Sequence, residues 1–236
     1  MSDLVFVADV HLVEGDGEIP VFQDFLRSLA GNASTCVIVG DLFNVWIAKR
    51  RFMGPGQRGL MDLLGEVSSR GVCFKYVEGN RDYFVRENWA GEPFREVAGS
   101  SLSEKIGPAR LLVTHGDLVN ELDRPYRTWR ALSRSWPVRG LLSLLPAPAG
   151  RRLGDTLERR LRGTNIRHKS AWPEEQVRRY AEAAFSRGYT GLVLGHFHQE
   201  IRLPLSSGTV WVLPDWKAGR RYLRFSPDGS GEFVSY

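Results

Sequence analysis

Five short polar clusters contain the side chains of this chain that are best suited to bind metal ions. The clusters are Asp9-Val10-His11, Gly40-Asp41, Gly79-Asn80-Arg81-Asp82, His115-Gly116-Asp117 and Gly195-His196-Phe197-His198. They hold four of the five histidines and neither of the two cysteines. Carboxylate, amide and imidazole ligands without a thiolate favour a borderline-hard divalent ion, with Mn²⁺ preferred and Fe²⁺, Zn²⁺ and Co²⁺ as alternatives.

Phosphoester chemistry is the reaction that such a ligand set favours. Two divalent ions about 3.5–4 Å apart can activate water, orient phosphoryl oxygens and offset charge during an in-line displacement. A single Asp-x-His or Gly-Asp after a strand is more typical of a capped turn. Five clusters in equivalent positions favour one shared site with two divalent ions as cofactors.

Each cluster follows a strand-like apolar run. These runs are Leu4–Val7, Cys36–Val39, Val72–Val77, Leu111–Thr114 and Gly191–Leu194. The carboxyl ends of strands in an open α/β sheet lie along one edge, so the clusters are predicted to converge there. Alternation along an extended chain also predicts that Asp9 and His11 lie on the same side.

Helical spacing separates several of these runs. Helices are predicted at Pro20–Leu29, Leu60–Ser69 and Glu174–Arg187, and short strands with Ser-Gly and Pro-Asp-Gly turns over Ile201–Tyr236. A length of 236 residues with 42% apolar and 25% charged residues fits one globular domain, 1–236, with an insertion. This composition argues against intrinsic disorder and against a fibrous repeat.

The compartment expected from the sequence is the cytoplasm. The first residues lack a basic leader, and no stretch approaches the roughly 20 consecutive apolar residues of a membrane span. Cys36 and Cys73 lie inside strand-like runs, which predicts buried, reduced thiols.

Basic residues are concentrated in one segment. The net charge is +5, but residues 124–169 hold twelve basic residues against only Asp155 and Glu158. An acidic body with a basic segment points to an anionic partner, and nucleic acid, phospholipid headgroups and a phosphorylated substrate all remain open.

The same segment is also amphipathic. Trp136–Pro146 is apolar, and Leu153, Leu157 and Leu161 fall on one helical face among arginines. This leucine face fits either packing against the body or the interface of an anionic membrane.

Together the five clusters resemble the signature of the calcineurin-like metallophosphoesterases, over positions 9 to 198. The resemblance implies an α/β (α+β) fold, a four-layer αββα sandwich with a helical cap inserted at 124–169. It also implies two metal sites that share Asp41 as the bridging ligand. The first would be formed by Asp9, His11, Asp41 and His198, and the second by Asp41, Asn80, His115 and His196.

One branch of that family is more similar than the rest. Many members have His after Gly-Asn, whereas Gly79-Asn80-Arg81-Asp82-Tyr83 is similar to the UDP-2,3-diacylglucosamine pyrophosphohydrolases of lipid A biosynthesis. The similar features also include Gly40–Trp46, Asp123-x-x-Tyr126 and Trp211–Trp216. The chain departs from the branch at Leu122, at Phe197 and in the length of the 162–169 stretch.

The branch implies hydrolysis of UDP-2,3-diacylglucosamine to UMP and 2,3-diacylglucosamine 1-phosphate. The cap would receive the acyl chains, with the enzyme held peripherally at the cytoplasmic face of the inner membrane. Arg81, always protonated and forked, would act with Asp41 in catalysis by clamping the diphosphate. The matching substrate contacts are Asn80, Arg81, Asp123, Tyr126, Asn165, Lys169 and His196, and Asp82 and Asp117 would orient Arg81 or the ligand histidines.

Two other functions remain open. One is a metallophosphoesterase that acts on another nucleotide-diphosphate lipid, a phosphodiester or a nucleic acid. The other is a scaffold of the same fold whose metal ions serve assembly, against which the complete ligand set argues. Under the preferred hypothesis we expect no nucleic-acid partner and no obligate protein partner.

Overall fold

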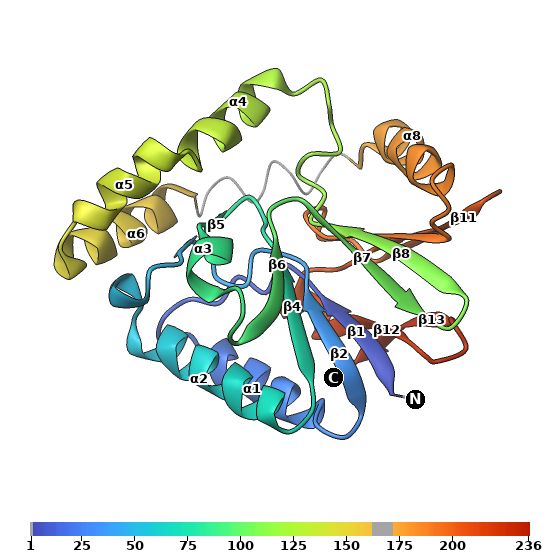
Figure 1. Ribbon diagram of the computed structural model, residues 1–236, viewed down its shortest axis with the longest axis horizontal. Helices are drawn as coiled ribbons and strands as arrows, with labels where there is room; N and C mark the ends of the chain where they lie inside the picture. Colours follow the sequence, from blue (N-terminus) through green and yellow to red (C-terminus); the bar gives the residue numbers. More distant parts are fainter. Residues whose placement is uncertain (1, 162–171) are drawn as a thin grey trace.

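Two β-sheets pack face to face at the centre of the structure (Figure 1), a computed structural model that describes residues 2–161 and 172–236. The six-stranded sheet has the order β13 (Gly231–Ser235), β12 (Arg221–Phe225), β1 (Asp3–Val7), β2 (Ala33–Ile38), β4 (Cys73–Val77) and β6 (Phe94–Ala98). The five-stranded sheet has the order β10 (Ile201–Leu205), β11 (Gly208–Val212), β9 (Gly191–Leu194), β8 (Ala109–Thr114) and β7 (Ser101–Ile106).

Both faces of the central strands are apolar because both are covered. In β1, Leu4 and Phe6 face the second sheet, while Val5 and Val7 belong to the core under the helices. Strands covered on both faces read as continuous apolar runs, which is why the sequence revealed them.

Helices complete the outer layers. α1 (Glu18–Ser28) and α2 (Pro55–Ser69) cover the outer face of the six-stranded sheet, and α8 (Glu174–Phe185) covers that of the five-stranded sheet (Figure 1). The predicted αββα layering is therefore confirmed. The shorter elements are β3 (Trp46–Ile47), η1 (Arg50–Phe52), β5 (Asp82–Tyr83), α3 (Val85–Trp89) and α9 (Trp216–Gly219).

The strands that precede the polar clusters end side by side. β1, β2 and β4 are parallel neighbours in one sheet, and β8 and β9 are parallel neighbours in the other. Register pairs Val7 with Ile38 and Thr114 with Leu194, so the strands of each sheet finish at the same level. The following loops of both sheets therefore meet at one edge of the sandwich.

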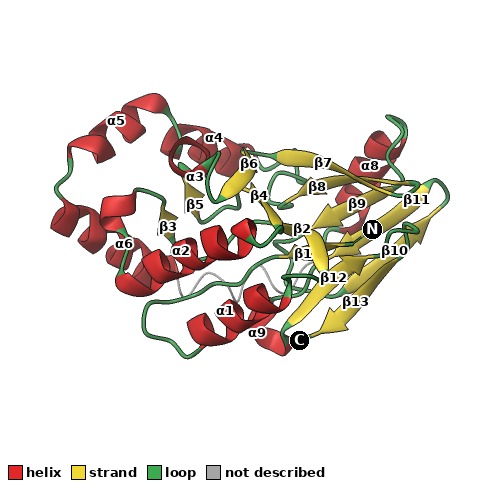
Figure 2. Cartoon of the chain, turned by 60° about the horizontal axis from the view of Figure 1, so that its bottom comes forward, coloured by secondary structure: helices red, strands yellow, loops and turns green. Residues whose placement is uncertain are grey.

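Three helices form a cap at one end of the sandwich (Figure 2). They are α4 (Arg124–Ser133), α5 (Trp136–Leu144) and α6 (Ala147–Leu161). Leu153 and Leu157 of α6 pack with Phe52 and Phe84 of the body, so these two leucines serve packing. No helix within the described ranges has both the length and the apolarity needed to span a membrane.

Several local expectations need correction. The helix expected at Leu60 begins at Pro55, because proline suits the first helical position and the Gln57 side chain accepts a hydrogen bond from the Gly54 amide at 3.2 Å. The C-terminal stretch expected to contain only strands includes α9, which Asp215 caps by accepting from the Lys217 amide at 2.8 Å. Cys36 is buried as expected, whereas Cys73 is only partly covered.

Candidate metal centre

The loops that follow the strands have an unusual backbone at the candidate ligands. Asp9, His11, Asp41, His196 and His198 all have φ between 50° and 70°, in the left-handed region. This conformation costs about 1 kcal/mol or more for a residue with a Cβ and is concentrated at functional sites. β1 ends at Val7, so turn geometry rather than strand alternation brings Asp9 and His11 together. The expected alternation was the wrong reason for their proximity.

Two glycines allow these loops to approach each other. A Cβ on Gly79 would lie 2.2 Å from Oδ1 of Asp41, and one on Gly40 would lie 2.4 Å from Nδ1 of His115. Only glycine fits at either position without moving a candidate ligand.

Asp9, His11 and His198 form the first group of ligand atoms. Oδ1 of Asp9 lies 3.7 Å from Nε2 of His11 and 3.6 Å from Nε2 of His198. Asp9 Oδ1 and both ring nitrogens of His11 are buried without a hydrogen-bond partner among the described residues. Buried polar atoms are normally satisfied, so this group fits a bound cation.

Asn80, His115 and His196 form the second group. Oδ1 of Asn80 lies 3.0 Å from both Nε2 of His115 and Nδ1 of His196. Asp41 is adjacent, with Oδ2 3.8 Å from Nε2 of His115. Ligand atoms of Asp9, Asp41 and His115 also lie within 4.8 Å of one another, so Asp41 stands between the two groups.

Hydrogen bonds from neighbouring groups orient these ligands. Nδ1 of His115 lies 2.9 Å from the Val39 carbonyl oxygen, and the His196 amide donates to Oδ2 of Asp9 at 2.7 Å across 187 positions of sequence. Partners of this kind fix the imidazole orientation that a metal requires.

Asp215 is a residue whose role the sequence did not reveal. Its Oδ2 lies 3.1 Å from Nδ1 of His198, which leaves Nε2 of that ring facing Asp9. A carboxylate on the far nitrogen of a ligand histidine raises its basicity and holds its orientation. The available signal was an acid three residues after the end of β11, the strand next to β9, inside the Trp211–Trp216 motif.

The mutual fields of these groups shift their pKa values. Burial, and then the neighbouring His115, lower the pKa of His196 to about 4. Burial also acts to lower the pKa of His115, but Asp41 and Asp9 together raise it to about 9. Burial opposes ionisation of Asp41, yet His115, His11 and Arg81 hold its pKa below the ordinary value. The site is therefore a buried set of strongly interacting acids and imidazoles.

Asp82 and Asp117 have other contacts than expected. Oδ2 of Asp82 accepts from the Asp41 amide at 2.9 Å and from the Gly79 amide and the Tyr76 hydroxyl at 2.8 Å. Burial and then Asp41 raise the pKa of Asp82 to about 7. Asp82 thus holds the backbone of two ligand loops rather than Arg81 or an imidazole. Asp117 bonds to Tyr126 and Arg130 of the cap.

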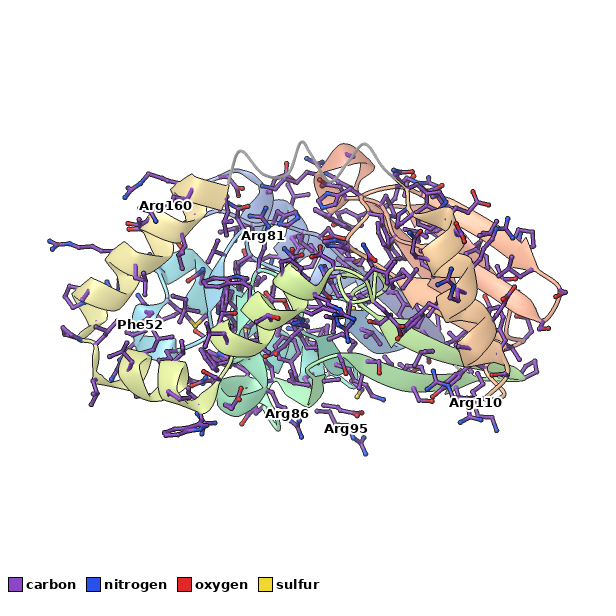
Figure 3. All side chains as sticks on the ribbon, turned by 90° about the horizontal axis from the view of Figure 1, so that it is seen from above. Phe52, Arg81, Arg86, Arg95, Arg110 and Arg160 are labelled. Carbon is purple, nitrogen blue, oxygen red and sulfur yellow. The ribbon has the colours of Figure 1, made fainter. Side chains whose placement is uncertain are left out.

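Arg81 lies between the candidate ligands and the cap. Its Nε is 3.7 Å from Oδ2 of Asp41, and its Nη2 donates to the Leu161 carbonyl at the end of α6 at 3.3 Å. Nη1 donates to the Asn44 carbonyl at 3.3 Å. Figure 3 places Arg81 in the interior, beside the helix that carries Arg160.

The structure places the remaining predicted substrate contacts as follows. Asp123 caps α4 by accepting from the Tyr126 amide at 3.0 Å, and the Tyr126 hydroxyl donates to Asp117. Asn165 and Lys169 lie outside the described residues. The ring of Phe197 turns into the outer core and packs edge-on against Trp172 at 5.2 Å.

Comparison with known proteins identifies sequence relatives and a structural neighbour of this chain. No family model matches the chain. The chain is 29% identical over 99% of its length to a UDP-2,3-diacylglucosamine hydrolase of Haemophilus influenzae, covering 98% of that protein. It is 27% identical over 92% of its length to the enzyme of that name from Chromohalobacter salexigens, covering 89% of it. A solved archaeal phosphodiesterase has a similar fold, with a TM-score of 0.53, 11% identity and 99% coverage of both chains. These findings confirm the resemblance that the motifs indicated.

Proposed function

We propose that this chain is a metal-dependent hydrolase of lipid A biosynthesis that cleaves UDP-2,3-diacylglucosamine into UMP and 2,3-diacylglucosamine 1-phosphate. The observation that carries the proposal is the nearly full-length similarity to hydrolases of that name. The convergence of the candidate metal ligands at one edge of the sandwich supports the same chemistry.

The ligand set fits two divalent ions. Asp9, His11, Asp41 and His198 would hold one ion, and Asp41, Asn80, His115 and His196 would hold the other. Mn²⁺ suits these oxygen and nitrogen ligands. When bound, such ions act as Lewis acids that withdraw charge from phosphoryl oxygens.

Arg81 would bind the diphosphate during its cleavage. A guanidinium is always protonated and presents paired donors that match phosphoryl oxygens. The Asn44 carbonyl bond and burial hold Arg81 next to Asp41, where negative charge increases during attack on the α-phosphorus. The departing sugar phosphate is a weaker base than an alkoxide, so no general acid is needed in this position.

A cavity between the body and the cap is our candidate for an acyl chain. It has a volume of about 270 Å³, and its lining combines Trp46, Ile47 and Phe52 of the body and Gly150 and Gly154 of α6 with the charged side chains of Glu14, Arg151, Asp155 and Glu158. Leu12, which directly follows the candidate ligand His11, also lines it. We propose that an acyl chain lies against Trp46, Ile47 and Phe52 in this space while the diphosphate of the same lipid lies at the metal ions.

The outer surface of the cap supports peripheral binding to an anionic membrane. Trp129, Trp136 and Leu144 are 58%, 79% and 82% exposed, which is unusual for large apolar side chains. Arg124, Arg127 and Arg139 are exposed on the same two helices, α4 and α5. Exposed tryptophan and leucine among cations are typical of surfaces that bind the headgroup region of anionic bilayers. We propose that this cap, residues 124–169, works at the cytoplasmic face of the inner membrane.

The decisive experiment is hydrolysis of UDP-2,3-diacylglucosamine in detergent micelles with Mn²⁺, following UMP release. An Asp9→Ala variant controls for contaminating activity, and a panel of water-soluble phosphodiesters and nucleic acids tests the alternatives. UMP release that Asp9→Ala abolishes would support the proposal. Cleavage of soluble diesters alone would leave a metallophosphoesterase but refute the lipid substrate.

A further inference from the structure

Helix α4 is oriented with its polar face toward the protein. Its inward positions include Tyr126, Arg130 and Arg134, spaced four residues apart on one helical face. Its apolar residues Trp129 and Leu132 are 58% and 60% exposed. Hydrogen bonds and ion pairs, rather than apolar packing, therefore attach this helix to the body.

Arg130 joins three segments of the body. The side chain is only 5% exposed, and its Nε lies 3.0 Å from Oδ2 of Asp117, two residues after the candidate ligand His115. Its Nη2 donates to the Glu78 carbonyl at 3.2 Å and to the Gly99 carbonyl at 2.9 Å. One cap side chain thus links the loops that follow β8 and β4.

Arg134 binds the backbone on both sides of Asn80 and Arg81, in the loop that follows β4. Its Nη2 donates at 2.8 Å to the carbonyl oxygens of both Gly79 and Asp82. Asn80 and Arg81 are the two residues between these carbonyls. On the amide side, the Asp82 carboxylate holds Gly79 to Asp41. The loop is therefore fixed through its carbonyls by the cap and through its amides by the body.

We propose that Arg130 and Arg134 are positioning residues, through which the cap helix α4 sets the geometry of the second metal site formed by Asn80, His115 and His196. Breaking these bonds shifts the Asn80 amide and the Arg81 side chain directly, and reaches the first site only through Asp41, whose Oδ1 accepts from the Arg81 amide at 2.9 Å. The cap therefore acts more strongly on the second metal site than on the first. This inference rests on the proposed function for its catalytic consequence, though not for its metal-binding consequence.

Mn²⁺ binding tests the assignment most directly. Arg134→Gln is the better variant, because Arg130→Gln would leave the buried Asp117 without its cation and risk unfolding. The two dissociation constants are measured by electron paramagnetic resonance during titration of the metal-free protein. Arg152→Gln, which removes an exposed cap charge elsewhere, is the matched control.

We expect Arg134→Gln to weaken the second Mn²⁺ by about 10–100-fold and the first, which shares only Asp41 with this loop, by much less. Arg134→Lys keeps the positive charge and N–H donors but has a shorter side chain without the planar guanidinium, so it should give an intermediate loss. It also serves as the test if the glutamine variant does not fold. Arg152→Gln should bind both ions like the parent.

Equal weakening of both ions, or two unchanged constants, would overturn the assignment, since a general loss of stability does not discriminate between neighbouring sites. Amide hydrogen exchange in residues 78–82 should be faster in Arg134→Gln than in the control. Failure of the parent enzyme to cleave the lipid would refute the proposed substrate alone. Selective loss of the second ion would still establish the positioning role.

Discussion

At the scale of single residues, the candidate ligands combine familiar chemistry with unfavourable backbone. The sequence predicted their types and clustering, because Asp, His and Asn after apolar runs are visible without a structure. Their left-handed φ angles were not predictable, since contacts from other strands impose them. Asp215 escaped notice for a similar reason, because its partner His198 is 17 positions away and meets it only in the folded sheet.

Arg81→Ala should reduce kcat by about 10²–10³-fold with little change in the binding of Mn²⁺, because it removes donors to the developing charge and no metal ligand. The check is UMP release at saturating Mn²⁺, alongside a metal titration of the same variant. Turnover near the parent value would contradict the clamp role.

Asp215→Ala should weaken Mn²⁺ at the site formed by Asp9, His11 and His198 by about 10–100-fold, because the imidazole of His198 loses its orienting carboxylate. Asp62→Asn, an exposed substitution on α2, is the control. Calorimetric titration measures both proteins. An unaltered first dissociation constant would show that His198 needs no such support.

At the scale of elements, the strands that the sequence predicts most clearly are those buried on both faces of a sheet. β1, β2, β4, β8 and β9 were predicted because neighbours cover both faces. β6 and β7 were missed because they are edge strands whose apolar residues alternate with charged or polar ones. The two-residue strands β3 and β5 are too short to leave any pattern.

The thiol of Cys36 in the central strand β2 should resist alkylation. Burial, and then the neighbouring Cys73, raise its pKa far above the ordinary value, so almost no thiolate exists near neutral pH. In a Cys73→Ala variant at pH 8, the rate at which a thiol reagent labels Cys36 in the native protein should not exceed the rate of unfolding. The denatured protein should be labelled immediately. Rapid labelling of the native variant would mean that β2 opens locally.

Two glycines of α6 should respond in opposite ways to alanine. A Cβ on Gly150 would lie 2.2–2.4 Å from the Phe52 ring, whereas one on Gly154 meets nothing within 4 Å. We expect Gly150→Ala to lower the free energy of unfolding by about 1–3 kcal/mol through overpacking. Gly154→Ala should raise it by up to about 1 kcal/mol through helix propensity. Denaturant unfolding of both variants measures these changes. Equal changes in the free energy of unfolding would show that α6 does not pack as described.

At the scale of the whole molecule, the charge asymmetry seen in the sequence becomes a spatial one. The described part of the basic segment, helices α4 to α6, forms a cap at one end of the sandwich (Figure 2). Trp129, Trp136 and Leu144 are exposed on this cap. The sequence could assign this segment an anionic partner but could not tell packing leucines from exposed ones. That distinction depends on which helix faces meet the body, as Leu157 does and Leu144 does not.

Trp136→Ser should weaken binding to vesicles of anionic phospholipid by about tenfold, the loss expected for roughly 1.5 kcal/mol of apolar burial. Trp136→Phe should largely retain binding, and added salt should weaken both. Cosedimentation with vesicles provides the measurement. Equal binding by the serine and phenylalanine variants would remove the cap from the membrane contact.

The hydrogen bond from His196 to Asp9 spans 187 positions of the chain, and it has a consequence for biogenesis. Synthesis must pass β9 before either group of ligands can be complete, because His196 and His198 follow that strand. Metal can stabilise only the finished fold, by an amount that grows with its free concentration. Cellular metal supply would then influence how much of this protein survives quality control, as well as how fast it works.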